Sequence, residues 1–130
     1  MFYVFHQLIT DDDDEDAKLT LPMDLTAGVI HQVDVLFQEG CVHKAHVQIF
    51  QGNFQIWPSN RGNTLRGNAT VVSFREFYEL ASGASDLHAM IWGDGTIDDV
   101  EVVIQIGLLP RTVIQPMSFE ALLQAAAGMK

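Results

Sequence analysis

Histidines are the residues of this chain that could most readily do chemistry, as metal ligands or proton carriers. There are five: His6, His31, His43, His46 and His88. The pair His43-x-x-His46 resembles a metal-binding pair, but residues three apart on a β-strand point to opposite faces, so the two imidazoles cannot reach one ion. His31 falls on an apolar stripe, where we expect a core histidine bonded to a backbone carbonyl. The pattern therefore predicts structural histidines and no metal site.

Cys41 lies two residues before His43, which suggests comparison with a thiol–imidazole nucleophile. The surrounding segment is typical of a turn, which offers no helix N-terminus to activate the thiol and no third residue to orient the imidazole. The chain also has no Gly-x-Ser-x-Gly, phosphate-loop or dinucleotide-binding motif. We expect no catalytic residues, no cofactor and, with one cysteine, no internal disulfide.

An acidic run over residues 11–16 contributes six negative charges to a formal net charge of −10. The run lacks the alternating ligands and central glycine of a calcium-binding loop, and adjacent carboxylates repel one another. We expect a solvated, extended tether there. The arginines are scattered and form no basic face, so we expect no direct contact with nucleic acid.

The stretch 58–68 is the best candidate for recognition, because it is a long run of turn-forming residues. It places planar polar side chains close to an aromatic ring, a combination that suits polar ligands and partner surfaces. These residues are Trp57, Asn60, Arg61, Asn63 and Arg66. A Trp57 buried in the core is the alternative interpretation.

The elements that must position these residues are mostly β-strands. Residues 28–50 alternate between apolar and polar side chains in two arms, joined by a glycine-containing turn. The pattern predicts a β-hairpin in which Val33 pairs with Val47, because only then do the two apolar faces coincide. In that register His46 lies across from Asp34.

Further strands are predicted by the same alternation, between turns rich in Gly, Asn and Asp. They cover residues 2–9, 17–22, 54–57, 69–74, 87–92 and 100–108. Residues 75–80 either extend the fourth of these or bend into a turn. Short strands of this kind favour an all-β fold, an antiparallel β-sandwich, with a jelly-roll-like barrel as the alternative.

Three regions follow along the chain: an N-terminal strand and acidic tether over 1–16, a β-sandwich over 17–117 and a C-terminal helix or tail over 118–130. The helix is expected because Ser118 can cap its first turn and Gly128 can end it. No apolar run is long enough to cross a bilayer, and we expect no membrane contact and no signal peptide.

The predicted strand over residues 2–9 precedes the tether and cannot be stable alone. It must join a sheet, either that of its own chain or that of a neighbouring copy. We therefore expect partner-binding residues in this strand and in the 58–68 loop: Phe2, Val4, Trp57, Asn60, Arg61 and Arg66.

Three segments resemble small β-sandwich structural proteins of tailed-virus (bacteriophage) particles. They are GVIHQVDVLFQEGC at 28–41, FQIWPSN at 54–60 and GLLP at 107–110. The resemblance implies a non-enzymatic virion protein, assembled in the host cytoplasm as a capsid decoration, connector or tail-associated subunit. Its implied partners are other copies of itself and other virion structural proteins. A carbohydrate- or receptor-binding module that uses the 58–68 loop is the alternative function.

Overall fold

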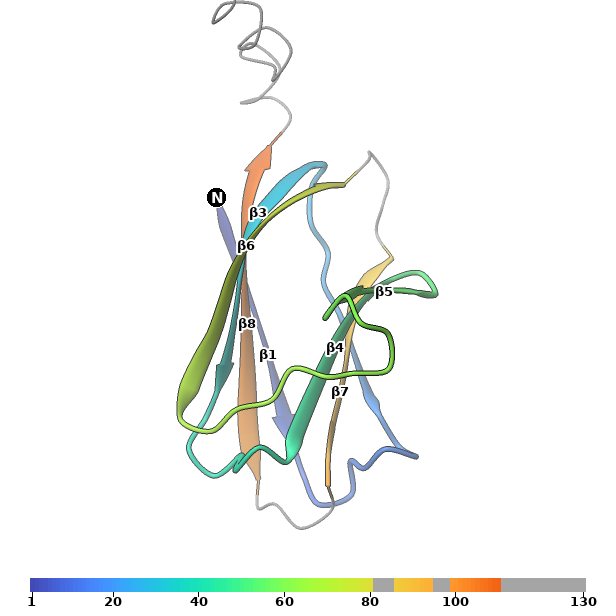
Figure 1. The fold of residues 1–130 in the computed structure, drawn as a ribbon, viewed down its shortest axis with the longest axis vertical. Helices are drawn as coiled ribbons and strands as arrows, with labels where there is room; N and C mark the ends of the chain where they lie inside the picture. The colour runs from blue at the N-terminus through green and yellow to red at the C-terminus, as the bar shows by residue number, and fades with distance from the viewer. Residues whose placement is uncertain (81–85, 95–98, 111–130) are drawn as a thin grey trace, which may run out of the picture.

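The computed structural model describes residues 1–80, 86–94 and 99–110, which form eight β-strands (Figure 1). Each predicted strand is present, and residues 75–80 extend the strand before them. The helix expected over 118–130 lies outside the described residues. Among the residues that are described, no helix could span a membrane. The strands are β1 (Phe2–Ile9), β2 (Leu19–Pro22), β3 (Gly28–Phe37), β4 (Ala45–Gln51), β5 (Phe54–Trp57), β6 (Thr70–Leu80), β7 (Leu87–Gly93) and β8 (Val100–Pro110).

The strands form two four-stranded antiparallel sheets that pack face to face (Figure 1). The first sheet has the order β1-β8-β3-β6, and the second has the order β2-β7-β4-β5. The predicted antiparallel β-sandwich is therefore confirmed. β1 is an edge strand of the first sheet and pairs with β8 of the same chain, from Phe2 opposite Gly107 to Ile9 opposite Val100.

The core lies between the two sheets, because alternate residues of each strand face the opposite layer. Strand β8 supplies the longest buried stripe: Val100, Val102, Ile104, Ile106 and Leu108. From the second sheet, the fully buried side chains of β4 and β7 complete the layer: Ala45, Val47, Ile49, Ala89 and Ile91. Each large aliphatic side chain buried in this way contributes about 1.5–3 kcal/mol, so this layer is the main source of stability.

The predicted hairpin over residues 28–50 is wrong. β3 pairs with β6 and β8 in the first sheet, whereas β4 pairs with β5 and β7 in the second. Val33 and Val47 are both fully buried, but they lie in opposite sheets. Asp34 and His46 also lie in opposite sheets. The alternation identifies the buried residues correctly over Val33, Val35 and Phe37 of the first arm and Ala45, Val47 and Ile49 of the second. It does not identify the neighbouring strand, because a hairpin and an arch between sheets bury the same side chains.

The arch from β3 to β4 occupies residues 38–44 and needs unusual backbone geometry. Gly40, Val42 and His43 have φ values of 107°, 48° and 58°. The side-chain oxygen of Asn68 accepts hydrogen bonds from the backbone N–H groups of Gly40 and Val42, each at 3.0 Å. The side chain of Asn68 thus provides partners that a regular strand pair would otherwise supply.

A β-bulge at His31 moves this residue off the core face. The pairing register of β3 shifts between Ile30 and Gln32 on both sides of the strand, so the buried stripe changes phase there. Ile30 is fully buried, whereas His31 is half-buried and packs edge-on against Phe2, with ring centroids 6.0 Å apart. The prediction of a core His31 is wrong, because a strict two-residue alternation does not take account of the extra residue that a β-bulge inserts.

The acidic run is not an extended tether, and that prediction is also wrong. It forms two tight turns, in which Asp13 N–H donates to Thr10 O at 3.1 Å and Ala17 N–H donates to Asp14 O at 3.0 Å. The N–H of Gly93, at the end of β7, donates to Asp13 O at 2.7 Å and fastens the run to the second sheet. Aspartate favours turns because its side chain accepts backbone hydrogen bonds, as Asp13 does from Thr10.

Candidate protein-interaction surface

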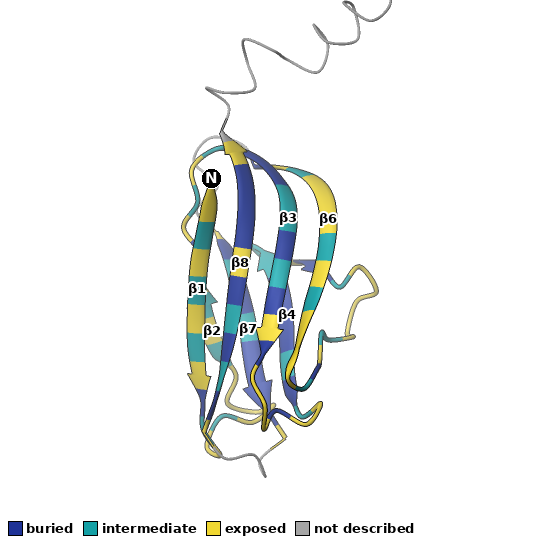
Figure 2. Ribbon diagram, turned by 90° about the vertical axis from the view of Figure 1, so that its left-hand side faces the viewer, coloured by how far each residue is buried: buried dark blue, intermediate teal, exposed yellow. Residues whose placement is uncertain are grey.

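Among the described residues, most of the large apolar side chains that are exposed lie on the first sheet. Ten large hydrophobic residues are exposed in the described part of the chain, and the second sheet carries one of them, Phe54. Figure 2 shows how exposed positions recur along β1 and β6, the two edges of the first sheet. Such clustering marks interaction sites, whereas isolated exposed apolar residues are ordinary. The seven on the first sheet are Phe2, Val4, Leu8, Leu36, Val71, Phe77 and Leu109.

Strand β1 is apolar on both of its faces. Phe2 and Val4 are 63% and 57% exposed on the outer side, whereas Tyr3 and Phe5 are half-buried on the inner side and stack on each other with centroids 6.4 Å apart. Antiparallel strands with one face in water normally carry polar residues on that face. Phe2 and Val4 therefore leave apolar side chains on the face of β1 that is open to water.

An apolar band crosses the outer face of the first sheet. The pairing register places Val103 of β8 beside Leu36 of β3, and Leu36 beside Val71 of β6. His6 of β1 lies next to Val103 and ends the band at the other edge. Leu36 and Val71 are 40% and 51% exposed. The apolar band is therefore continuous across β8, β3 and β6.

Polar residues separate this band from the far end of the sheet. Asp34 accepts a hydrogen bond from Gln32 Nε2 at 3.2 Å and another from the hydroxyl of Ser73. Gln32 also donates to the oxygen of Ser73 at 3.2 Å. These hydrogen bonds hold the Asp34 carboxylate in place on the outer face. A polar group at a fixed position there can determine how a partner is oriented.

A shallow groove of about 570 Å³ opens at the end of the band. Apolar and acidic side chains line it together: Leu8, Leu36, Val103, Glu39, Asp99 and Glu101. The lining suits a partner that presents an apolar side chain next to a basic one.

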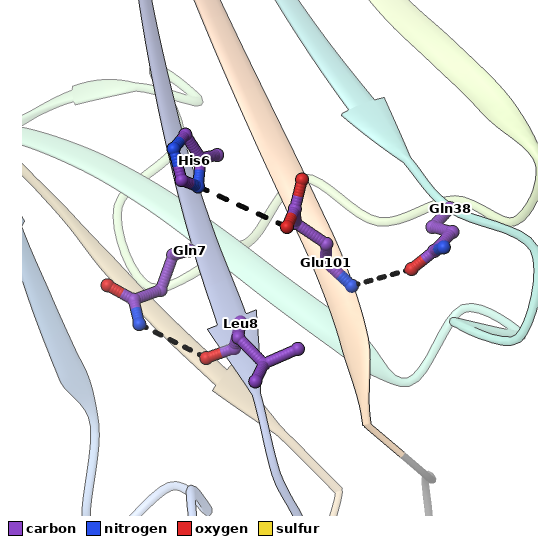
Figure 3. Close-up of polar contacts among 5 residues, drawn as sticks. All are labelled: His6, Gln7, Leu8, Gln38 and Glu101. Carbon is purple, nitrogen blue, oxygen red and sulfur yellow. Dashed lines mark hydrogen bonds and ion pairs between the residues drawn. The ribbon is translucent and has the colours of Figure 1, made fainter.

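Glu101 lies between His6 of β1 and Gln38 at the end of β3 (Figure 3). Its backbone N–H donates to Gln38 Oε1 at 2.8 Å, and its carboxylate lies 4.0 Å from Nδ1 of His6. On the adjacent strand, Gln7 Nε2 donates to the carbonyl oxygen of Leu8 at 3.1 Å. That carbonyl points away from β8 toward the open edge of the sheet (Figure 3).

Gly107 allows two rings to lie directly on the backbone of β8. A Cβ atom at this position would stand 2.8 Å from Cε1 of Phe2 and 3.0 Å from Nε2 of His31. The glycine in the GLLP segment therefore lets Phe2 and His31 pack edge-on at this corner of the outer face.

The loop after Trp57 is a separate surface beside the second sheet. Trp57 is 4% exposed and packs edge-on against Phe74 and Tyr78, so the alternative interpretation of a core Trp57 is the one the structure supports. Asn60, Arg61, Asn63 and Arg66 are exposed. The structure does not bring these loop residues together with Phe2 and Val4, because β1 is an edge of the other sheet.

Two buried glutamines hold this loop in place. Gln55 donates to the carbonyl oxygens of Pro58 and Asn63 at 2.8 and 3.2 Å and accepts from the N–H of Gly62 at 3.2 Å. Gln48 also donates to Asn63 O, at 3.0 Å. Sequence reasoning missed both glutamines. Gln55 gave a signal as the one polar residue of β5, whereas Gln48 shares β4 with His46 and Gln51 and gave none.

His46 is part of a polar cluster that the sequence also did not reveal. Its Nδ1 lies 2.8 Å from Thr64 Oγ1 and its Nε2 lies 2.9 Å from Asp94 Oδ1. Its ring stacks on Trp92 with centroids 5.1 Å apart, and the ammonium of Lys18 lies 4.3 Å from the centre of the same indole. Both ring nitrogens are occupied, so His46 fastens the loop to the end of β7 and does not present a free ligand atom.

Cys41 and the remaining histidines do not form a reactive site in the described part of the chain. Cys41 is fully buried, and burial raises the pKa of its thiol above its usual value, which keeps the thiol protonated. No group of three potential metal ligands comes together among the described residues. No protein-family model matches the chain, and no curated protein matches it significantly.

Proposed function

We propose that this chain is a non-enzymatic structural subunit of a virus particle, acting through protein–protein contacts made by the outer face of its first sheet. A capsid decoration, a connector or a tail-associated protein would each use such a surface. Its partners in this proposal are other copies of the chain and other structural proteins of the particle.

One observation carries the proposal: of the ten large hydrophobic residues that are exposed in the described part of the chain, seven lie on the first sheet. Water disfavours such a surface by about 25 cal/mol for each Å² of apolar area left exposed, so a partner that covers it gains stability. Phe77, Phe2 and Val4 have the largest exposed fractions of the seven, at 66%, 63% and 57%. The resemblance of three segments to tailed-virus structural proteins supplies the setting of a virus particle.

The test combines a mass-spectrometric inventory of purified particles with one variant and its control. We expect the chain in many copies per particle. Leu36→Lys should reduce incorporation at least about tenfold, because it places a charge in the apolar band. Thr26→Lys adds the same charge at an exposed position between β2 and β3 and should be incorporated normally.

Two results would contradict the proposal. Absence of the chain from particles would remove the assigned role. Incorporation of Leu36→Lys at the level of Thr26→Lys would show that the outer face of the first sheet is not the contact surface.

A carbohydrate- or receptor-binding module is the second candidate, favoured by one contact. The guanidinium of Arg61 lies 4.9 Å from the ring centre of Phe54, which is 54% exposed, and together they form a flat, charged platform. Trp57 is buried and cannot serve this purpose. Binding on a glycan array that is lost in Arg61→Ala and kept in Arg75→Ala would support this candidate, and no binding would end it.

A further inference from the structure

We propose that β1 is a pairing edge, where a second copy of this chain adds its own β1 in antiparallel orientation and joins two first sheets into one. This inference specifies the partner for the contact role proposed above and rests on it. The sheet edge is a surface distinct from the apolar band on the outer face.

The backbone of β1 leaves alternate residues with hydrogen-bonding groups that point to the open edge. Met1 and Leu108 exchange both backbone hydrogen bonds, at 3.0 and 2.7 Å. Hydrogen-bonded and non-hydrogen-bonded pairs alternate in an antiparallel ladder, and the register with β8 runs without a shift from Phe2 to Ile9. The odd-numbered residues of β1 therefore bond to β8. The backbone N–H and C=O groups of the even-numbered residues point away from β8, to the open edge of the sheet. These residues are Phe2, Val4, His6 and Leu8.

The close-up of β1 is consistent with this assignment. The side chain of Gln7 donates to the carbonyl oxygen of Leu8 at 3.1 Å, and this carbonyl lies on the side of β1 that faces away from β8 (Figure 3). Among the described residues, no strand pairs with β1 on this side. Unpaired backbone groups along a strand edge are a template for another strand.

Of the four edge strands, β1 is the long one that lacks the usual protection against pairing. β2 and β5 have four residues each, and β2 ends at Pro22. β6 has eleven residues, but it carries Arg75, Glu76 and Glu79 and faces the bulge at His31. Charges, proline and bulges are the devices that keep edge strands apart. The eight residues of β1 include no Asp, Glu, Lys, Arg or Pro and no bulge.

The sequence of β1 is complementary to itself in one antiparallel register. With the two-fold axis at Phe5, Phe2 pairs with Leu8 of the second copy and Val4 pairs with His6 of the second copy. All four outward residues of each strand then form hydrogen-bonded pairs, each pair exchanging two bonds. Apolar side chains meet on the outer face, and His6 faces Val4 instead of another His6. A shift of the axis by one residue would lose one of these pairs.

The antiparallel direction also keeps the acidic runs of the two copies apart. Each run begins directly after β1, so the two runs lie at opposite ends of the shared ladder. Strand geometry separates those ends by about 25–30 Å, which exceeds the Debye length of about 8 Å at physiological salt. The net charge of −10 therefore opposes this pairing only weakly.

Cysteine substitution tests this register in the full chain. Two Phe5→Cys chains would place their Cα atoms about 4.5 Å apart on the axis, within disulfide range. Two Tyr3→Cys chains would be offset by four residues, about 13 Å, and could not form a bridge. Tyr3 and Phe5 are both half-buried aromatic residues on one face of β1, so the two variants are matched. We expect rapid disulfide-linked dimers from Phe5→Cys and at least about tenfold fewer from Tyr3→Cys.

A mixture of Tyr3→Cys and Gln7→Cys chains should crosslink, because these positions face each other in the proposed register. Sedimentation of the wild-type chain, which does not depend on the folding of any variant, should show a reversible dimer. Val4→Lys should weaken that dimer at least about tenfold. Gln105→Lys, exposed on β8 beside Val4, should leave it unchanged.

A wild-type chain that stays monomeric at hundreds of micromolar, with Phe5→Cys failing to crosslink, would overturn the inference. The same pattern would result if residues 111–130 or another protein occupied the edge. Equal crosslinking of Tyr3→Cys and Phe5→Cys would overturn the register. None of these results removes the chain from a virus particle, which the inventory tests separately, and a dimer without particle incorporation would leave the pairing intact.

Discussion

Gly67 lies where two neighbouring side chains leave no space for another. A Cβ atom there would stand 2.6 Å from Cγ2 of Thr70 and 3.0 Å from Cδ2 of Phe37, which is fully buried. We expect Gly67→Ala to lower the free energy of unfolding by about 1–3 kcal/mol, as overpacking does. Gly107→Ala is the matched control. It displaces only the outer ring atoms of Phe2 and His31 and should cost less than about 1 kcal/mol.

Urea denaturation of both variants and of wild type, by circular dichroism, measures the difference. Equal losses for the two alanines would show that Phe37 can move aside, and that the core near the arch is looser than its burial indicates.

The pH dependence of stability above neutrality should reflect Cys41 and Tyr78. Burial raises the pKa of the Cys41 thiol above 9.0. Burial, and to a lesser extent the negative charge of the Asp86 carboxylate, raise the pKa of the Tyr78 hydroxyl above 10.0. In alkaline solution the unfolded chain therefore releases these protons before the folded chain does. The unfolded state then binds fewer protons, so the free energy of unfolding falls as pH rises from about 9.

The decline should be shallower in Cys41→Ala from its onset and shallower in Tyr78→Phe above pH 10. Urea titrations at fixed ionic strength between about pH 8 and 11 measure both slopes. A free energy of unfolding that stays flat or rises over this range in wild type would contradict the assignment.

The side-chain contacts of the histidines could not be predicted from the sequence. His43 lies in the arch and not on a strand, so the strand spacing from which the sequence argued does not describe it, and the spacing could not predict that His46 bonds to Thr64 and Asp94. These contacts join segments far apart in the chain, and single-sequence periodicity carries no information about them.

At the scale of elements, the arch between β3 and β4 depends on one side chain. Asn68→Ala would remove the acceptor for the N–H groups of Gly40 and Val42. At about 0.5–1.5 kcal/mol for each bond, we expect a loss of about 1–3 kcal/mol in the free energy of unfolding. Asn68→Asp keeps a side-chain acceptor and should retain most of the stability.

Hydrogen exchange provides the measurement that is specific for the arch. The amides of Gly40 and Val42 should lose protection in Asn68→Ala more than the amides of β7 do. Unchanged protection at Gly40 and Val42 would mean that the arch is held by its own backbone geometry.

The elements themselves were predictable because β1 and β2 alternate between buried and exposed faces along their whole length and most other strands do so along part of theirs. Their partners were not. Val33 and Val47 satisfy a hairpin and an arch equally well, and the bulge at His31 reverses the phase without any change in composition. Strand pairing is decided by the packing of the whole sandwich, so a local pattern gives the members of the core and not the topology.

At the scale of the whole molecule, the fold class and the apolar strand at residues 2–9 could be inferred from sequence, whereas the contact surface could not. Phe2 and Val4 stand out in the sequence, but Leu36 and Val71 join them only because β3 and β6 are neighbours in the first sheet. The outer face is assembled from four strands that are distant in the chain. The order of those strands was the missing information.

Net charge gives the last prediction, which concerns how two copies associate. Each chain carries −10, while β1 contributes no Asp, Glu, Lys or Arg. Salt screens the repulsion between the two negatively charged chains of the dimer. It has no ion pair between the two β1 strands to weaken, so added salt should strengthen the dimer. We expect the dimer dissociation constant to fall at least about threefold between about 0.05 and 0.5 M NaCl, measured by analytical ultracentrifugation. Asp11→Asn, Asp12→Asn and Asp16→Asn together should reduce this dependence only slightly, because the two acidic runs of the dimer lie farther apart than the Debye length. A dimer that weakens with salt would instead be held by ion pairs, which β1 cannot supply.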